Sequence, residues 1–535
     1  MPEGKSPDLV SSFLKDTTCV AKVNRENDIF LGRQEGRSAF TAFSTAVQVG
    51  YDRYRKRYAK ALKDIPPGKV ICVDEGVTVT FNENRCQFCV ALLKKNDKSY
   101  CAKCRVDKRC KVIRATEDGL VEELRQHGML EFGVRIVLFF PVAEIIEVLR
   151  MKEDPSQWTR GFSSKSFFAV FCLQPSTVDV PDIRAAFSRP IRLILSRLAS
   201  HPEWGNIGNP TRDDYFCQAV EMAMARVPTN AHSIYHPDGE PLLVGNFDSP
   251  LADLLENVLW CSSSSSSPPP KNGHTKSCSH AKMNQKVPPT SVPLAVGCFP
   301  AVSILNHSCR PNTWTYCHEN RMIVVSRGIR KDEEITDSYG PTIYTHPFVE
   351  RVQALSSRGF KCTCVECAME GAALAPHPAT QIRIDANVES AEKMVEELRA
   401  FPNFAVAYRL LGQVERLLSS NDLTLAHSYR IVSLIAAREG KMAECASVLA
   451  RFAASYERLQ QDVDGVTATI AHAQAVIALA EYHRTGDVRQ AHAAEAFAFR
   501  ALSQMTTIYG KHGILTRSLV RFIKERNMLA LSSSP

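Results

Sequence analysis

The sequence predicts an α+β fold in several domains, and three observations carry that prediction. Residues 70–73 (VICV) and 76–81 (GVTVTF) follow a Pro-Pro-Gly turn, and the second stretch alternates apolar and polar side chains as a half-buried strand does. After Cys367 the composition shifts to alanine and leucine at helical spacing. Two dense cysteine clusters precede that shift. We therefore expect a β-rich part that carries metal sites, followed by an all-α part.

The composition is that of a globular protein. Of the 535 residues, 44% are hydrophobic and 23% are charged, which argues against global disorder and predicts roughly two to four domains. The longest apolar run, residues 136–143, is too short to span a bilayer. The first residues carry no basic-then-apolar signal segment. We expect a soluble protein of the cytoplasm and nucleus.

The net charge of +8 is concentrated in two stretches, residues 53–60 and 94–114. A solvated basic face is the default interpretation of such stretches. Attraction to acidic protein tails or to nucleic acid is the alternative.

Further elements can be placed along the chain by pattern. Helices are expected at 122–129 and 180–198, and a buried strand at 322–325. Residues 261–289 are rich in serine and proline and poor in apolar side chains, so we expect a disordered surface loop there. Gly440 and Gly486 stand where helix C-caps are expected, ahead of alanine-rich helices at 442–459 and 488–505. These helices loosely resemble tetratricopeptide pairs.

The later cysteine cluster has the spacing of a metal site. Cys362, Cys364 and Cys367 can all reach one tetrahedral ion, and Zn²⁺ with sulfur ligands at about 2.3 Å fits that spacing. A fourth ligand must come from elsewhere in the fold. In a reducing compartment, clustered thiols indicate metal binding rather than disulfides.

The earlier cluster contains two CxxC pairs and a fifth thiol. Its members are Cys86, Cys89, Cys101, Cys104 and Cys110. A short loop with few buried apolar side chains needs a cross-link to be stable, and a bound zinc ion supplies one. A redox CxxC is disfavoured because no thioredoxin-like βαβ pattern surrounds it. We expect one zinc ion held by four of the five thiols, and about two zinc ions in the chain.

Two polar blocks lie between the clusters. The first, residues 303–312 (SILNHSCRPN), places Asn306 and His307 in an apolar setting, where they must be hydrogen-bonded to backbone or to a ligand. The second, residues 332–341 (DEEITDSYGP), ends in Tyr339. Taken alone, a core histidine and a packing tyrosine are the default interpretations.

The order of these blocks changes that interpretation. An Asn-His-Ser-Cys-x-Pro-Asn motif, then an acidic turn ending in tyrosine, then CxCx2C resembles the SET lysine methyltransferase domain with its post-SET zinc. The two CxxC pairs resemble a MYND finger, truncated after Cys110. The whole chain is therefore similar to the SET-and-MYND (SMYD) family, and residues 339–341 most resemble its fourth vertebrate-type member. Residues 508–512 are similar to the family's tetratricopeptide-like C-terminal domain.

The resemblance implies six segments. It divides the chain into an N-terminal segment at 1–45, a first SET part at 46–85, a MYND-like finger at 86–114, the SET remainder at 115–345, a post-SET zinc region at 346–372 and a helical domain at 373–535.

The resemblance also implies roles for individual residues. Tyr339 would be the catalytic residue, with its hydroxyl beside the migrating methyl group. Cys309 would be the fourth ligand of the zinc held by the CxCx2C cluster. The residues implied to contact S-adenosylmethionine are Arg57, Asn230, Ser303, Asn306, His307, Tyr339 and Phe360. Because an unperturbed phenol titrates near ~10, Tyr339 is not expected to act as a general base.

By the same resemblance, the expected function is S-adenosylmethionine-dependent methylation of lysine on histone or non-histone proteins. Partner proteins would bind the finger and the C-terminal helices. The sequence departs from the family at residues 56–60 (KRYAK), where a glycine-x-glycine-like turn is usual. The alternative is therefore a catalytically weak SET-MYND scaffold that binds partners and regulates transcription. A nucleic-acid binder is the third class.

Overall fold

The computed structural model describes most of the chain outside its first 41 residues and several connecting segments. The described residues are 42–80, 85, 120–151, 166–176, 180–234, 295–318, 320–343, 346, 348–356, 359–374, 390–391, 393–394, 403–418, 422–459, 465–509 and 514–525. The five cysteines of the predicted finger and the predicted loop at 261–289 lie outside these ranges, so both remain predictions.

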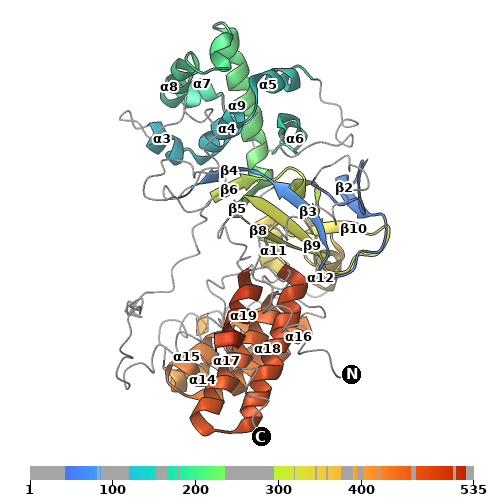
Figure 1. Cartoon of the computed structure of the whole chain (residues 1–535), viewed down its shortest axis with the longest axis vertical. Helices are drawn as coiled ribbons and strands as arrows, with labels where there is room; N and C mark the ends of the chain where they lie inside the picture. Colours follow the sequence, from blue (N-terminus) through green and yellow to red (C-terminus); the bar gives the residue numbers. More distant parts are fainter. Residues whose placement is uncertain are drawn as a thin grey trace.

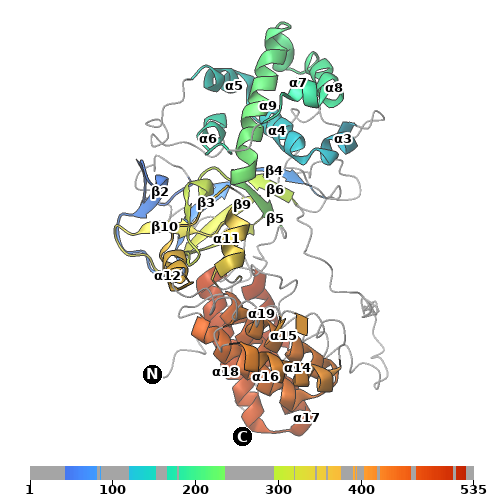
Figure 2. The ribbon, with the colours of Figure 1, turned by 180° about the vertical axis from the view of Figure 1, so that it is seen from behind.

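The molecule is built in three tiers, which Figures 1 and 2 display from opposite sides. Small sheets form the middle tier. One outer tier, here called the helical insert, contains α3 (Leu120–Gln126), α4 (Gly128–Phe139), α5 (Val142–Leu149), α6 (Phe167–Phe171), α7 (Ile183–Ala186), α8 (Ser188–Leu198) and α9 (Thr211–Asn230). The other outer tier, the C-terminal helical domain, contains α14 (Phe404–Leu417), α15 (Leu423–Arg438), α16 (Met442–Leu459), α17 (Gly465–Thr485), α18 (Val488–Tyr509) and α19 (Ile514–Glu525).

The described strands form three sheets. The first has the order β1 (Val47–Asp52), β2 (Lys56–Ala61), β10 (Glu334–Asp337) and β7 (Asn306–His307). The second has the order β3 (Val70–Glu75), β9 (Arg321–Ser326) and β8 (Thr313–His318). The third has the order β4 (Val77–Thr80), β6 (Ala295–Cys298) and β5 (Ala231–Ile234). The pairing of β7 with β10 is parallel, whereas the other strand pairs are antiparallel.

One hydrophobic core joins the sheets to the helical insert. Helix α4 is buried on nearly all sides and packs on α9, where a Cβ at Gly133 would lie 2.8 Å from Met224. Within this helix Arg135 forms a buried ion pair with Glu131 at 2.8 Å, so the two charges partly compensate each other within one helix turn. Helix α9 continues directly into β5, so the insert is fixed to the third sheet.

Two short helices lie between the sheets and the C-terminal helical domain (Figures 1 and 2). They are α11 (Phe348–Ser356) and α12 (Val365–Leu374). The C-terminal domain has its own core and contacts β8, where the Tyr316 hydroxyl donates to the Tyr509 carbonyl at 3.5 Å.

The sequence predictions for local structure are largely confirmed. The predicted strands at 70–73 and 322–325 fall within β3 and β9, β4 covers residues 77–80 of the strand predicted at 76–81, and the C-terminal helices are present. Gly440 and Gly486 have φ of 73° and 70°, the left-handed conformation of a C-cap glycine. The mixed α+β content is therefore confirmed, whereas the tetratricopeptide-like identity of the last domain remains a prediction.

Two predicted helices are interrupted. The pattern at 122–129 is divided at His127 between α3 and α4, and the pattern at 180–198 is divided at Phe187 between α7 and α8. These two rings contact each other, with centroids 4.9 Å apart, so the two breaks lie side by side. Among the described residues, no helix is long and apolar enough to cross a membrane.

Candidate active site and metal centre

The two polar blocks of the sequence meet through the parallel pair of β7 and β10. Asn306 stands opposite Thr336, and His307 stands opposite Asp337. The amide N–H of Ser308 then donates to the Asp337 carbonyl at 3.0 Å. This short pairing places residues 306–309 beside residues 337–339, although the two segments come from separate parts of the sequence.

Asn306 connects the site to the hairpin of β1 and β2, here called the first hairpin. Its Nδ2 donates to the carboxylate of Glu334 at 2.8 Å and to the backbone carbonyl of Arg57 at 3.2 Å. The Arg55 carbonyl is a third acceptor at 3.3 Å. Asn306 is therefore hydrogen-bonded within the protein, mainly to backbone carbonyls. Its contact with the cofactor remains a prediction.

Three aromatic side chains form the centre of the site. The ring of His307 lies 5.2 Å from that of Tyr339 and 5.8 Å from that of Phe360, with the latter contact edge-on at 88°. The rings of Tyr339 and Phe360 are 5.5 Å apart. The structure therefore brings together three residues that the sequence had assigned to one site.

The Tyr339 hydroxyl is hydrogen-bonded to the residue that precedes β7. It donates to the Leu305 carbonyl at 3.2 Å. Burial, together with the negative charge of Asp337, raises the pKa of Tyr339 to about 12. The phenol therefore stays protonated at neutral pH, which agrees with the expectation that it is not a general base.

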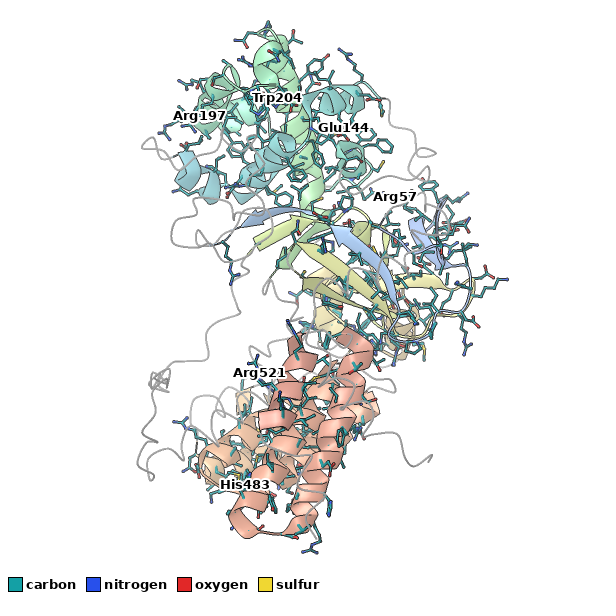
Figure 3. The ribbon with its side chains drawn as sticks, viewed as in Figure 1. Arg57, Glu144, Arg197, Trp204, His483 and Arg521 are labelled. Carbon is teal, nitrogen blue, oxygen red and sulfur yellow. The ribbon has the colours of Figure 1, made fainter. Side chains whose placement is uncertain are left out.

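Arg57 is buried where β2 meets the helical insert (Figure 3). Burial lowers the pKa of Arg57 to about 10, and the nearby charge of Arg226 on α9 acts in the same direction. Arg226 is itself buried and donates to the Phe171 carbonyl at 3.0 Å. Two like charges in one buried region favour an anionic group nearby, such as a ligand carboxylate.

Asn230 and Ser303 each donate to the backbone of a neighbouring segment. Asn230 Nδ2 donates to the carbonyls of Gln174 and Arg226, both at 2.8 Å. The Ser303 hydroxyl donates to the Phe299 carbonyl at 2.9 Å and lies 3.4 Å from Nε2 of His232. Sequence reasoning did not single out His232, although it stands two residues after Asn230.

The later cysteine cluster closes on Cys309 as the resemblance implied. The sulfur atoms of Cys309, Cys362, Cys364 and Cys367 lie within 4.8 Å of one another. The Cys309 sulfur is 3.9 Å from that of Cys362 and 3.4 Å from that of Cys367. Four thiolates around one tetrahedral Zn²⁺ would stand about 3.8 Å apart, given Zn–S bonds near 2.3 Å. The residues present therefore fit a closed structural zinc site.

Two arginines hold the helices around this cluster. Arg310 pairs with Glu366 of α12 at 2.6 Å. Arg351 of α11 is 2% exposed, pairs with Glu370 at 2.7 Å and interacts with the Cys309 thiol. The positive charge of Arg351 suits a site in which four thiolates leave a zinc centre with net negative charge. Arg351 lies 42 residues after Cys309, and no pattern in the sequence predicted that the two would be close.

The family profile that matches this chain is the SET domain, over residues 56–340. That range covers more than half of the 535 residues and contains β2, β7, β10 and Tyr339. The chain belongs to the SET domain family. The family resemblance that the polar blocks indicated is thereby confirmed.

Curated relatives agree with this assignment. "SET domain-containing protein 3" of Caenorhabditis elegans is 28% identical over 336 residues, covering 61% of this chain and 60% of the relative. Human "Protein-lysine N-methyltransferase SMYD4" is 42% identical over 89 residues, covering 16% of this chain and 11% of the relative. "Histone-lysine N-methyltransferase ATXR2" of Arabidopsis thaliana is 38% identical over 74 residues, covering 13% and 15%. This chain thus spans less than two thirds of the length of these SET domain relatives.

Proposed function

We propose that this SET domain protein is an S-adenosylmethionine-dependent protein-lysine N-methyltransferase with histone or non-histone protein substrates. The observation that carries the proposal is the parallel pair of β7 and β10, which gathers His307, Tyr339 and Phe360 beside the four cysteines. Names of the relatives that contain "lysine N-methyltransferase" support the same reaction class.

The residues divide the work of such a reaction between binding and alignment. The donor set fits S-adenosylmethionine, because Arg57 offers a buried cation for a carboxylate and Phe360 offers an aromatic face. Arg57, Asn230, Ser303, Asn306, His307 and Phe360 would hold it. When bound, S-adenosylmethionine supplies a methyl group already activated by the sulfonium charge. The protein then mainly needs to align a neutral lysine amine and to exclude water.

Tyr339 is the residue that we assign to the reacting centre. Its ring packs against His307 and Phe360, and its protonated hydroxyl is fixed by the Leu305 carbonyl. A fixed dipole in a site of low dielectric constant can stabilise small charges that develop in the transition state. A buried channel also lowers the pKa of a target lysine, which favours its neutral form.

A catalytically weak scaffold that binds partners and regulates transcription is the second candidate, and Lys56 favours it. This residue starts β2 with a φ of 58°, a conformation that suits glycine, at the stretch where the SMYD-like pattern expects a glycine-containing turn. In either case we propose that partner proteins bind the MYND-like finger and the tetratricopeptide-like helices. We also propose that the protein works in cytoplasm and nucleus.

A cofactor titration separates the two candidates. Purified full-length protein is titrated with S-adenosylmethionine in a calorimeter and then incubated with the methyl-labelled cofactor and a lysine-rich protein mixture. The methyltransferase proposal predicts saturable binding and label on lysine. The scaffold candidate predicts neither binding nor label in protein that is folded and loaded with zinc.

A further inference from the structure

The imidazole of His307 lies between the cysteine cluster and the backbone of Tyr339. Its Nδ1 accepts a hydrogen bond from the Tyr339 amide N–H at 3.0 Å, and its Nε2 lies 3.3 Å from the Cys309 sulfur. The ring is 7% exposed, and the edge-on Phe360 ring restricts its rotation. One buried side chain therefore contacts both the residue assigned to the reacting centre and a residue of the candidate metal centre.

The tautomer of this histidine follows from the Tyr339 contact. A backbone N–H can donate to Nδ1 when that nitrogen carries a lone pair, so the proton of the neutral ring stands on Nε2. That N–H then faces the Cys309 sulfur. A zinc-bound thiolate is a good acceptor, and such contacts outside the ligand set orient the ligands and adjust metal affinity.

We propose that His307 is a positioning residue that couples metal binding at the four cysteines to the placement of Tyr339. The thiolate of Cys309 fixes Nε2–H, the ring orientation follows, and Nδ1 then holds the Tyr339 amide. His307 acts through its two neighbours in this scheme and does not need to touch the reacting atoms. The consequence for turnover rests on the proposed function, whereas the coupling itself does not.

Two substitutions of His307 each remove one of its two hydrogen bonds and keep the other. In His307→Asn the side-chain oxygen can replace Nδ1 and keep the Tyr339 contact, but nothing reaches Cys309. In His307→Gln the longer amide can replace Nε2–H and keep the Cys309 contact, while the acceptor for Tyr339 is lost. Each variant therefore interrupts a different half of the link.

His201 supplies a matched control. It is also 7% exposed, and its Nδ1 accepts backbone N–H groups from Glu203 and Trp204, both at 3.2 Å. It belongs to the helical insert, and neither Glu203 nor Trp204 is a member of the cysteine cluster. His201→Asn thus reproduces the loss of a buried imidazole without touching the proposed link.

The first readout is zinc affinity, measured by competition with a chromophoric chelator on the full chain. His307→Asn should weaken zinc binding roughly 10- to 100-fold, as loss of a contact to a ligand does in other zinc sites. His307→Gln and His201→Asn should stay close to wild type. Equal zinc affinity of wild type and a folded His307→Asn protein would overturn the proposal.

The second readout is hydrogen exchange at the Tyr339 amide, resolved by fragmentation mass spectrometry. Zinc removal should speed this exchange in wild type, and His307→Gln should speed it even with zinc bound. In His307→Asn, zinc removal should add little, because the link is already cut. The same acceleration on zinc removal in wild type and His307→Asn would mean that the post-SET region loosens as a whole, which would contradict the coupling. Neither readout needs methyl transfer, so failure of the proposed function would leave both results interpretable.

Discussion

The buried carboxylate of Asp74 accepts a hydrogen bond from the backbone N–H of Ala301 at 2.7 Å. The next amide, that of Val302, donates to the same oxygen at 3.1 Å. These donors open the 3₁₀ turn Val302–Ile304, which leads directly into β7. A carboxylate on β3 thus fixes the start of the segment that carries Asn306 and His307.

Removing the Asp74 carboxylate should lower the stability of the protein. Asp74→Ala leaves two buried amides without their charged acceptor, and we expect the free energy of unfolding to fall by about 2–4 kcal/mol. Asp182→Ala is a matched control, since Asp182 also accepts two backbone N–H groups at a helix start, but on an exposed turn. That control should cost about 1 kcal/mol. Urea titrations of both variants check the difference, and equal costs would contradict the role of burial.

The cysteine cluster predicts a metal-dependent fold around α11 and α12. Cys364→Ala should remove one equivalent of zinc and lower the melting temperature, because the remaining three thiols leave the ion open to exchange. Cys445→Ala removes a buried thiol of the C-terminal core, which donates to the Ser433 carbonyl. It should leave the zinc content unchanged. Elemental analysis of both variants is the measurement, and full zinc content in Cys364→Ala would exclude the four-cysteine site.

The left-handed conformation of Lys56 predicts a stabilising substitution. Lys56→Gly relieves a backbone strain of about 1–2 kcal/mol, and after the entropy cost of glycine we expect a net gain of about 0.5–1 kcal/mol. Lys60→Gly lies in the same strand with ordinary backbone and should destabilise by a similar amount. Chemical denaturation measures both. A loss of stability in Lys56→Gly would show that its side chain contributes more than its backbone costs.

Asn306 joins β10 to the first hairpin beside the proposed cofactor site. Asn306→Ala removes the bonds to Glu334 and to the Arg57 carbonyl, so we expect S-adenosylmethionine affinity to fall about 10-fold or more, ahead of any loss in the chemical step. Asn312→Ala is the control, because its amide also holds β10, through the Glu334 carbonyl at 2.8 Å. It should lower stability while leaving cofactor affinity close to wild type. Calorimetric titration of both variants tests this, and equal affinities would remove Asn306 from the site.

Local patterns in the sequence predicted the strands, helix ends and ligand spacings that depend on neighbouring residues. Alternation at 76–81 predicted β4, and glycines at 440 and 486 predicted two helix ends. The cysteine spacing at 362–367 predicted a metal site, because three ligands on one short turn need little help from the fold. The family resemblance, rather than spacing, supplied Cys309 and Tyr339.

Contacts between distant segments were beyond such patterns. The two-residue strand β7 is too short to have a periodicity, yet its parallel pairing with β10 assembles the site. Asp74 and Arg351 read as an ordinary strand residue and an ordinary helix residue. They gain their roles because the fold brings them to Ala301 and to Cys309. The break at His127 likewise coincides with a ring contact to Phe187, which lies at the break between α7 and α8.

Tyr339→Phe is the sharpest test of the proposal that Tyr339 aligns methyl transfer to lysine. This change removes one oxygen, keeps the ring packed against His307 and Phe360, and removes the hydrogen bond to Leu305, which contributes about 1 kcal/mol of stability. Turnover of labelled methyl groups onto a lysine-rich protein should fall roughly 10²-fold or more, while cofactor affinity should change little. Equal turnover by wild type and the folded Tyr339→Phe protein would exclude this role for the Tyr339 hydroxyl.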